Sequence, residues 1–101
     1  MSASSPTGSA DAAGNWRGSK NAAGQLASIE KVFAFANFDL AMAFANSVAA
    51  IASAQDHHPV LLIQWGSCVV RWSTHDAGNT VTPRDVTCAE LCDQAYAAAA
   101  R

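Results

Sequence analysis

All three histidines of the chain lie in two short polar motifs. His57 and His58 stand together between an aspartate and a proline, and His75 follows His58 by seventeen residues, between a Ser-Thr pair and another aspartate. Imidazole both donates and accepts protons near neutral pH without special tuning. Histidine is also costly in a core unless it is hydrogen-bonded. The concentration of the histidines therefore predicts a site for acid–base chemistry.

Composition limits the class of protein. The chain has 101 residues, of which 50% are hydrophobic and 14% charged, which suits one small domain with a single core. Its six Lys and Arg residues are scattered and its formal net charge is −2, so direct binding to nucleic acid is not expected. No apolar run approaches the roughly 20 residues that cross a bilayer, so no membrane span is expected.

The cysteines Cys68, Cys88 and Cys92 are odd in number and contain no Cys-x-x-Cys pair. We interpret them as reduced core residues, which favours a cytoplasmic location, with the nucleus as a second option. A zinc site that joins Cys88 and Cys92 to the histidines is an alternative, although its spacing matches no familiar zinc motif. Otherwise the sequence predicts neither a metal nor another cofactor.

The chain divides into a front segment and a domain. Residues 1–25 are mostly Ser, Ala, Gly, Thr and Asn, with no hydrophobic periodicity and a single tryptophan, Trp16. Such a composition buries too little apolar surface to offset the entropy of ordering. We therefore expect residues 1–25 to be a disordered tail and residues 26–101 to form a single domain.

The first part of the domain predicts a strand followed by a helix. From Ile29, residues at every second position form one apolar face of a half-buried strand. Lys31 is the one polar residue on that face. Asn37 suits a helix N-cap, and apolar residues then recur at helical spacing to about Gln55. Pro59 forbids further helix, so the paired histidines are expected where this helix gives way to the next strand.

The second part predicts a hairpin and a final helix. Two strands rich in Val, Ile, Leu and Trp are expected at residues 60–65 and 68–74, joined by a tight turn, with His75 at the exit of the second. The last helix is expected to begin at Thr82, with proline at its first position and the carboxylate of Asp85 three residues after the cap.

This order of elements predicts an α+β fold. We expect an antiparallel sheet of three to four strands with two or three helices packed on one face. One face and the edges of such a small sheet stay uncovered, which favours a homodimer or a homotetramer. The large side chains Trp65, Arg71 and Trp72 are expected to cover the sheet or to contact a partner.

Laid out in this way, the chain resembles the pterin-4a-carbinolamine dehydratases, known in animals also as dimerisation cofactors of a homeodomain transcription factor. The resemblance covers about residues 29–96. It rests on the spacing of two histidine motifs and on a set of flanking residues. These are Phe33, Phe35, Phe38, Ala41, Phe44, Asp56, His57, His58, Pro59, Thr74, His75, Asp76, Thr82 and Asp85.

The resemblance implies a lyase that dehydrates 4a-hydroxytetrahydropterin to quinonoid dihydropterin in tetrahydrobiopterin recycling, without a cofactor. It implies that His57, His58 and His75 are catalytic and also contact the pterin. It further implies that the pocket is lined by Asp56, Ser73, Thr74 and Asp76. For Asp85 two interpretations stay open: it orients a histidine, as the resemblance implies, or it only caps the last helix, and the two can hold together.

The chain departs from the family at three places, one of which is a loop between His75 and Asp85 that is one residue longer than usual. Ser53 stands where the family usually has a glutamate, four residues before the first paired histidine. The usual opening helix and the tryptophan after it are not recognisable in residues 1–25. Two further hypotheses therefore stay open beside the enzyme: a non-enzymatic dimerisation or scaffold module that binds a transcription factor or another protein, and a histidine cluster that binds a metal.

Overall fold

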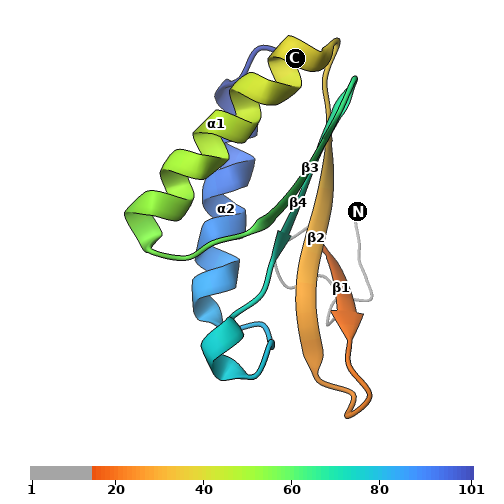
Figure 1. Ribbon diagram of the computed structural model, residues 1–101, viewed down its shortest axis with the longest axis vertical. Helices are drawn as coiled ribbons and strands as arrows, with labels where there is room; N and C mark the ends of the chain where they lie inside the picture. The colour runs from red at the N-terminus through yellow and green to blue at the C-terminus, as the bar shows by residue number, and fades with distance from the viewer. Residues whose placement is uncertain (1–14) are drawn as a thin grey trace.

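The structure, a computed structural model, describes residues 15–101. Within this range two helices cover one face of a four-stranded antiparallel sheet whose strand order is β1-β2-β4-β3 (Figure 1). The predicted α+β fold is confirmed. The elements in chain order are β1 (Arg17–Lys20), β2 (Leu26–Ala34), α1 (Phe38–Gln55), β3 (Val60–Gln64), β4 (Ser67–Trp72), a short 3-10 helix (His75–Ala77) and α2 (Pro83–Ala98).

The core lies between the sheet and the two helices. In the central strand pair, β2 and β4, Ile29 lies opposite Trp72 and Phe33 lies opposite Cys68, all buried on the inner face. Side chains on one face of a strand alternate with those on the other, so the intervening residues point away from the helices. The inner face is completed by α1 and α2, whose buried apolar residues are Ala41, Phe44, Ala45, Val48, Ala52, Cys88, Ala89 and Cys92.

Lys31, the polar residue expected on the inner face of β2, is neutralised by α2. Its Nζ lies 2.8 Å from Oδ1 of Asp93. The other carboxylate oxygen of Asp93 accepts a hydrogen bond of 3.1 Å from Nε1 of Trp16. A partly buried charge is tolerated when it is paired and hydrogen-bonded, which explains how a lysine fits beside the core.

The prediction of a disordered segment up to residue 25 is wrong for residues 15–25. Residues 17–20 form β1, which pairs with the first half of β2, and Trp16 is fully buried against Phe33 at a ring-centroid distance of 5.7 Å. The composition of the segment suggested disorder, but one large aromatic side chain supplies the apolar surface that its small residues lack. The expectation for residues 1–14 lies outside the described residues.

A tight turn returns the chain from β1 to β2. The side chain of Asn21 accepts hydrogen bonds of 3.0 Å from the backbone N–H groups of Ala23 and Gln25. Gly24 has a φ of 81°, a conformation that glycine adopts without steric cost. The local turn signal was therefore present in the sequence, although the pairing of β1 depends on contacts made far along the chain.

The ends of α1 place the paired histidines. Asn37 is the N-cap, and its Oδ1 accepts a hydrogen bond of 2.9 Å from the backbone of Leu40, as predicted. The helix ends at Gln55, and Asp56 follows in the left-handed conformation with a φ of 50°. This turn, together with Pro59, directs the chain from the helix layer into β3. Among the described residues, no helix is both long and apolar enough to cross a membrane.

Candidate active site

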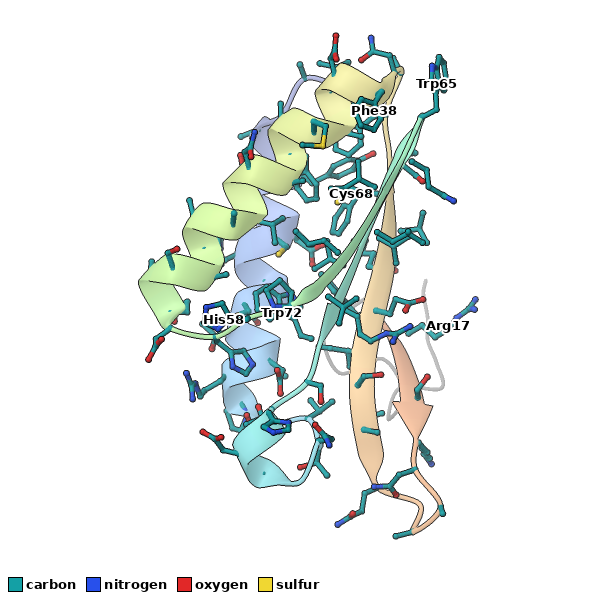
Figure 2. All side chains as sticks on the ribbon, in the orientation of Figure 1. Arg17, Phe38, His58, Trp65, Cys68 and Trp72 are labelled. Carbon is teal, nitrogen blue, oxygen red and sulfur yellow. The ribbon has the colours of Figure 1, made fainter. Side chains whose placement is uncertain are left out.

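The two histidine motifs meet at one end of the molecule. His57 and His58 follow α1, whereas His75 begins the 3-10 helix after β4. Figure 2 shows His58 beneath the end of α1 and Trp72 beside it, close to where the chain leaves the sheet. A cleft of about 180 Å³ opens there, and it collects all seven residues that were expected to line a pocket, together with Arg84: Asp56, His57, His58, Ser73, Thr74, His75, Asp76 and Arg84.

His57 is the buried histidine of this cleft, with 7% of its surface exposed. Its Nε2 lies 2.5 Å from Oδ1 of Asp85, whose side chain is fully buried in the first turn of α2. A carboxylate beside one ring nitrogen favours the proton on that nitrogen, so the neutral imidazole keeps Nδ1 as an acceptor. The pair therefore leaves Nδ1 as the ring nitrogen of His57 that can accept a proton.

The second oxygen of Asp85 is held by α2 and by the end of β4. Oδ2 accepts a hydrogen bond of 2.8 Å from the backbone N–H of Thr82, which is the predicted N-cap interaction of α2. It also accepts a hydrogen bond of 2.6 Å from the hydroxyl of Thr74. Asp85 thus caps the last helix and lies beside a histidine at the same time, and its orientation is fixed by both contacts.

Trp72 packs against the face of His57. The two rings are stacked, with centroids 5.5 Å apart and an angle of 10° between their planes. Trp72 is fully buried, so the expectation that it covers the sheet or contacts a partner is wrong. Position 72 lies on the inner face of β4, opposite Ile29, and strand alternation puts it on the same face as the buried Val70. Its contact with a histidine from another element could not be read from that alternation.

Arg84 is the cleft residue that sequence reasoning did not select. Its Nη2 donates hydrogen bonds to the backbone carbonyls of Gln55, at 3.2 Å, and of Asp56, at 2.7 Å. These carbonyls end α1 and have no helical partner, and a cation at a helix C-terminus also suits the helix dipole. Arg84 therefore connects the end of α1 to the start of α2, directly beside the paired histidines.

His58 and His75 are exposed on the rim of the cleft. Nδ1 of His75 lies 3.1 Å from Oδ1 of Asn79, in a loop where Asn79 adopts a φ of 59°. The backbone of Thr74 is fixed by a hydrogen bond of 2.9 Å to the carbonyl of Thr80. His75 is thus held on a short closed loop at the edge of the cleft.

The cysteines do not take part in the cleft. Cys68, Cys88 and Cys92 are free and buried, as the sequence predicted. Burial raises the pKa of all three thiols, and that of Cys92 to about 12, so they stay protonated near neutral pH. Across residues 15–101, no group of three or more His, Cys, Asp or Glu side chains is arranged to hold a metal ion.

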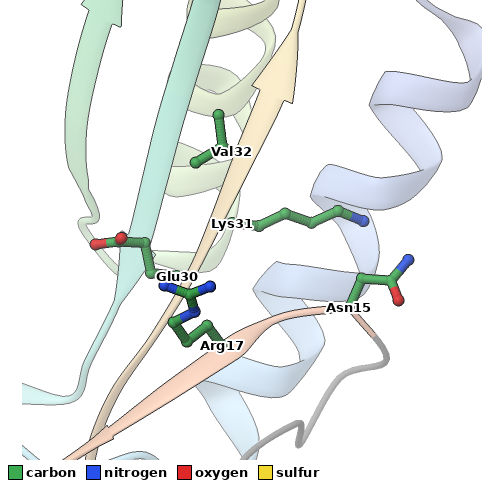
Figure 3. Close-up of a pocket in the computed structure, with 5 residues that line it drawn as sticks. All are labelled: Asn15, Arg17, Glu30, Lys31 and Val32. Carbon is green, nitrogen blue, oxygen red and sulfur yellow. The ribbon is translucent and has the colours of Figure 1, made fainter. Parts of the chain in front are cut away.

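Two larger hollows lie on the sheet. One, of about 310 Å³, is lined by Asn15, Arg17, Glu30, Lys31 and Val32 (Figure 3). The other, of about 380 Å³, includes exposed apolar residues of β3. Glu30 borders both hollows, and its carboxylate pairs with Arg71 of the second at 2.9 Å. Neither hollow contains a histidine, so the smaller cleft is the stronger candidate for acid–base chemistry.

Comparison with known proteins shows a family to which the chain is similar. The family model of pterin 4 alpha carbinolamine dehydratase matches residues 6–95. A protein of Paracidovorax citrulli with the provisional name pterin-4-alpha-carbinolamine dehydratase is 44% identical over 74% of this chain and 64% of its own length. A protein of Marinobacter nauticus with the same provisional name is 41% identical over 67% of this chain and 60% of its own length. The chain thus spans about three fifths of the curated relatives that it matches.

Solved structures share the fold. A transcriptional coactivator/pterin dehydratase from Brucella melitensis aligns with a TM-score of 0.70 and 28% identity, over 84% of this chain and 85% of its own. A pterin dehydratase-like protein, described as a RuBisCO assembly factor in the alpha-carboxysome, aligns with a TM-score of 0.65 at 17% identity, over 80% of this chain and 88% of its own, which shows the fold alone. From the family match, the sequence relatives and the fold together, the chain belongs to the pterin 4 alpha carbinolamine dehydratase family.

Proposed function

We propose that the protein is a hydro-lyase that dehydrates 4a-hydroxytetrahydropterin to quinonoid dihydropterin. The observation that carries the proposal is the cleft that gathers all three histidines of the chain, with His57 bonded to the buried carboxylate of Asp85. Family membership supports the substrate class. The proposal extends to tetrahydrobiopterin recycling, because the product is the oxidised pterin that a reductase must return to the tetrahydro form.

The reaction needs one acid and one base. The bond between C4a and its hydroxyl oxygen breaks, and the electron pair leaves with the oxygen, which takes a proton and departs as water. The N5–H proton is lost to a base, and its bonding pair forms the double bond between N5 and C4a. Each positioned proton transfer contributes roughly 10²–10⁴-fold in rate. Two imidazoles of the cleft are enough to supply both transfers.

The proposed roles follow from the contacts of each histidine. His57 is fixed by Asp85, which stabilises the positive charge that forms when Nδ1 takes a proton. His58 and His75 lie on the rim, where they reach a molecule that enters from solvent. We assign all three to proton transfer and pterin contact, and we assign Asp85 to orienting His57.

The other cleft residues are proposed to hold the pterin ring. The carboxylates of Asp56 and Asp76 accept hydrogen bonds from the N–H groups of a pterin, and the hydroxyls of Ser73 and Thr74 both donate and accept. A ring held by such groups brings its reacting atoms to the histidines at the same time, which is the main benefit of positioning.

A scaffold function is the second candidate. The Brucella neighbour carries the names of a transcriptional coactivator and of a pterin dehydratase together. In this chain, Val32, Val60 and Leu62 are exposed on the open face of the sheet, where another molecule can bind.

We propose that the protein forms a homodimer or a homotetramer in the cytoplasm, consistent with its uncovered sheet and its reduced thiols.

The test compares histidine and helix variants in a stopped-flow assay with chemically generated 4a-hydroxytetrahydropterin. His57→Ala and His75→Ala are expected to lower kcat by about 10²-fold or more, with unchanged circular dichroism. Asn46→Ala, a change on the exposed side of α1, is the control and should keep full activity. Wild-type turnover in both histidine variants would contradict the enzyme proposal. If Asn46→Ala also weakened binding to a partner protein, the two results together would favour the scaffold function.

A further inference from the structure

Two different contacts restrain the ring of His57. Asp85 bonds to Nε2 at the edge of the ring, and Trp72 stacks on its face at 5.5 Å and 10°. Nε2 lies nearer to the axis of the Cβ–Cγ bond than Nδ1 does, because it is on the far side of the imidazole from Cβ. A hydrogen bond at Nε2 therefore allows rotation about that bond more readily than a flat stack against the ring does.

Trp72 also carries a cost that packing alone does not require. Its side chain is fully buried, and within the described residues its Nε1 meets no acceptor with good hydrogen-bond geometry. Burial raises the pKa of the nearby Cys92 thiol, and the indole offsets part of that rise. A buried N–H group without a partner is destabilising, and a leucine or a phenylalanine would fill an inner position of β4 without that group. Unlike a leucine, the indole presents a broad rigid aromatic face, and the ring of His57 stacks against that face.

We propose that Trp72 is a positioning residue for His57: it sets the plane of the imidazole and thereby the direction in which Nδ1 faces the cleft. Asp85 selects the nitrogen that carries the proton, and Trp72 selects where the other nitrogen points. The kinetic part of this inference rests on the proposed function. The structural part, restraint of the His57 ring, does not.

The kinetic test uses three matched variants. Trp72→Leu removes the aromatic face, Trp72→Phe keeps one, and Trp65→Leu makes the same chemical change at a residue that is 70% exposed at the opposite end of the sheet (Figure 2). We expect Trp72→Leu to lower kcat by about 10- to 100-fold with KM changed less than about twofold, because misplacement of a reacting group costs rate rather than binding. Trp72→Phe should recover most of the loss, and Trp65→Leu should leave kcat unchanged.

A second comparison asks whether Trp72 acts through His57. In a His57→Ala background, Trp72→Leu should change kcat by less than about twofold, because the group that it positions is absent. An equal loss in both backgrounds would show a general packing effect and would overturn the inference. So would a Trp72→Phe variant that is no more active than Trp72→Leu while both remain folded.

The third measurement does not depend on activity. Side-chain NMR relaxation of the His57 ring should show a lower order parameter in Trp72→Leu than in the wild type, Trp72→Phe or Trp65→Leu. Unchanged order with wild-type kcat in Trp72→Leu would overturn the inference and leave the proposed function intact. If the wild type does not accelerate the dehydration, the proposed function is contradicted. A lower order parameter in Trp72→Leu would still show that Trp72 restrains the ring of His57.

Discussion

Asp85 and His57 are 28 residues apart in the sequence and share a hydrogen bond of 2.5 Å in a buried position. The same carboxylate caps α2 through the backbone of Thr82. One side chain therefore defines the start of a helix and the orientation of an imidazole. This dual use ties the orientation of His57 to the formation of α2.

Replacing Asp85 should separate its two functions. Asp85→Asn keeps the size of the side chain and removes its charge, so the proton on Nε2 of His57 is no longer favoured. We expect kcat to fall by about 10- to 100-fold, and 15N NMR to show His57 with a changed tautomer population. A variant that retains both the wild-type tautomer and wild-type kcat would show that Asp85 acts only as a cap.

Arg84 should support the end of α1. Arg84→Ala removes two hydrogen bonds to the carbonyls of Gln55 and Asp56, and we expect a loss of about 1 kcal/mol in the free energy of unfolding. Denaturant titration measures this loss, and Arg84→Lys should recover part of it because the lysine keeps the charge. A stability equal to the wild type in Arg84→Ala would show that the contact does not hold the two helices together.

Trp16 should stabilise the whole domain. Trp16→Ala removes a fully buried indole and its hydrogen bond to Asp93, so we expect the free energy of unfolding to fall by about 3–5 kcal/mol. Thermal unfolding followed by circular dichroism measures the effect, with Trp65→Leu as the exposed control. A loss below about 0.5 kcal/mol is what a disordered front segment would give, and it would contradict the order of residues 15–25.

The buried thiol of Cys92 should make the fold sensitive to alkaline pH. Burial raises its pKa from 9.0 to about 12, so the folded chain retains a proton that the unfolded chain releases above pH 9.0. The contribution to stability is complete below pH 9.0 and decreases as pH rises toward 12, by up to roughly 1.4 kcal/mol per pH unit. Urea titrations between these pH values should show a shallower decline in Cys92→Ala than in the wild type; equal slopes would refute the assignment.

Local signals in the sequence predicted much of the fold. Asn37 and Thr82 suit N-caps, and both helices begin there; the alternation around Ile29 predicts the inner face of β2. Such signals act over a few residues, so one sequence contains them in full. The strand ends were less well predicted: the turn falls at Trp65 and Gly66, so β3 ends and β4 begins one residue earlier than expected, and β4 ends at Trp72 rather than at residue 74.

What the sequence did not predict depends on contacts between distant segments. The burial of Trp16 needs Phe33 and α2, and the stack of Trp72 needs the turn that places His57. Arg84 acts on carbonyls that become neighbours only after both helices have packed. The histidines were found by their type and spacing and by a family resemblance, which also implied that Asp85 orients one of them. The contacts of Trp72 and Arg84 required the tertiary structure.

The rate of dehydration is the most direct measure of whether the histidines of this protein catalyse the proposed reaction. Chemically generated 4a-hydroxytetrahydropterin is mixed with the wild type, and formation of quinonoid dihydropterin is followed by absorbance from about pH 5 to about pH 9. We expect a large acceleration with a bell-shaped pH profile, and we expect it to be abolished when His57, His58 and His75 are all replaced by alanine in a protein that stays folded. A wild-type rate equal to the spontaneous rate, or a triple variant as fast as the wild type, would contradict the proposed function.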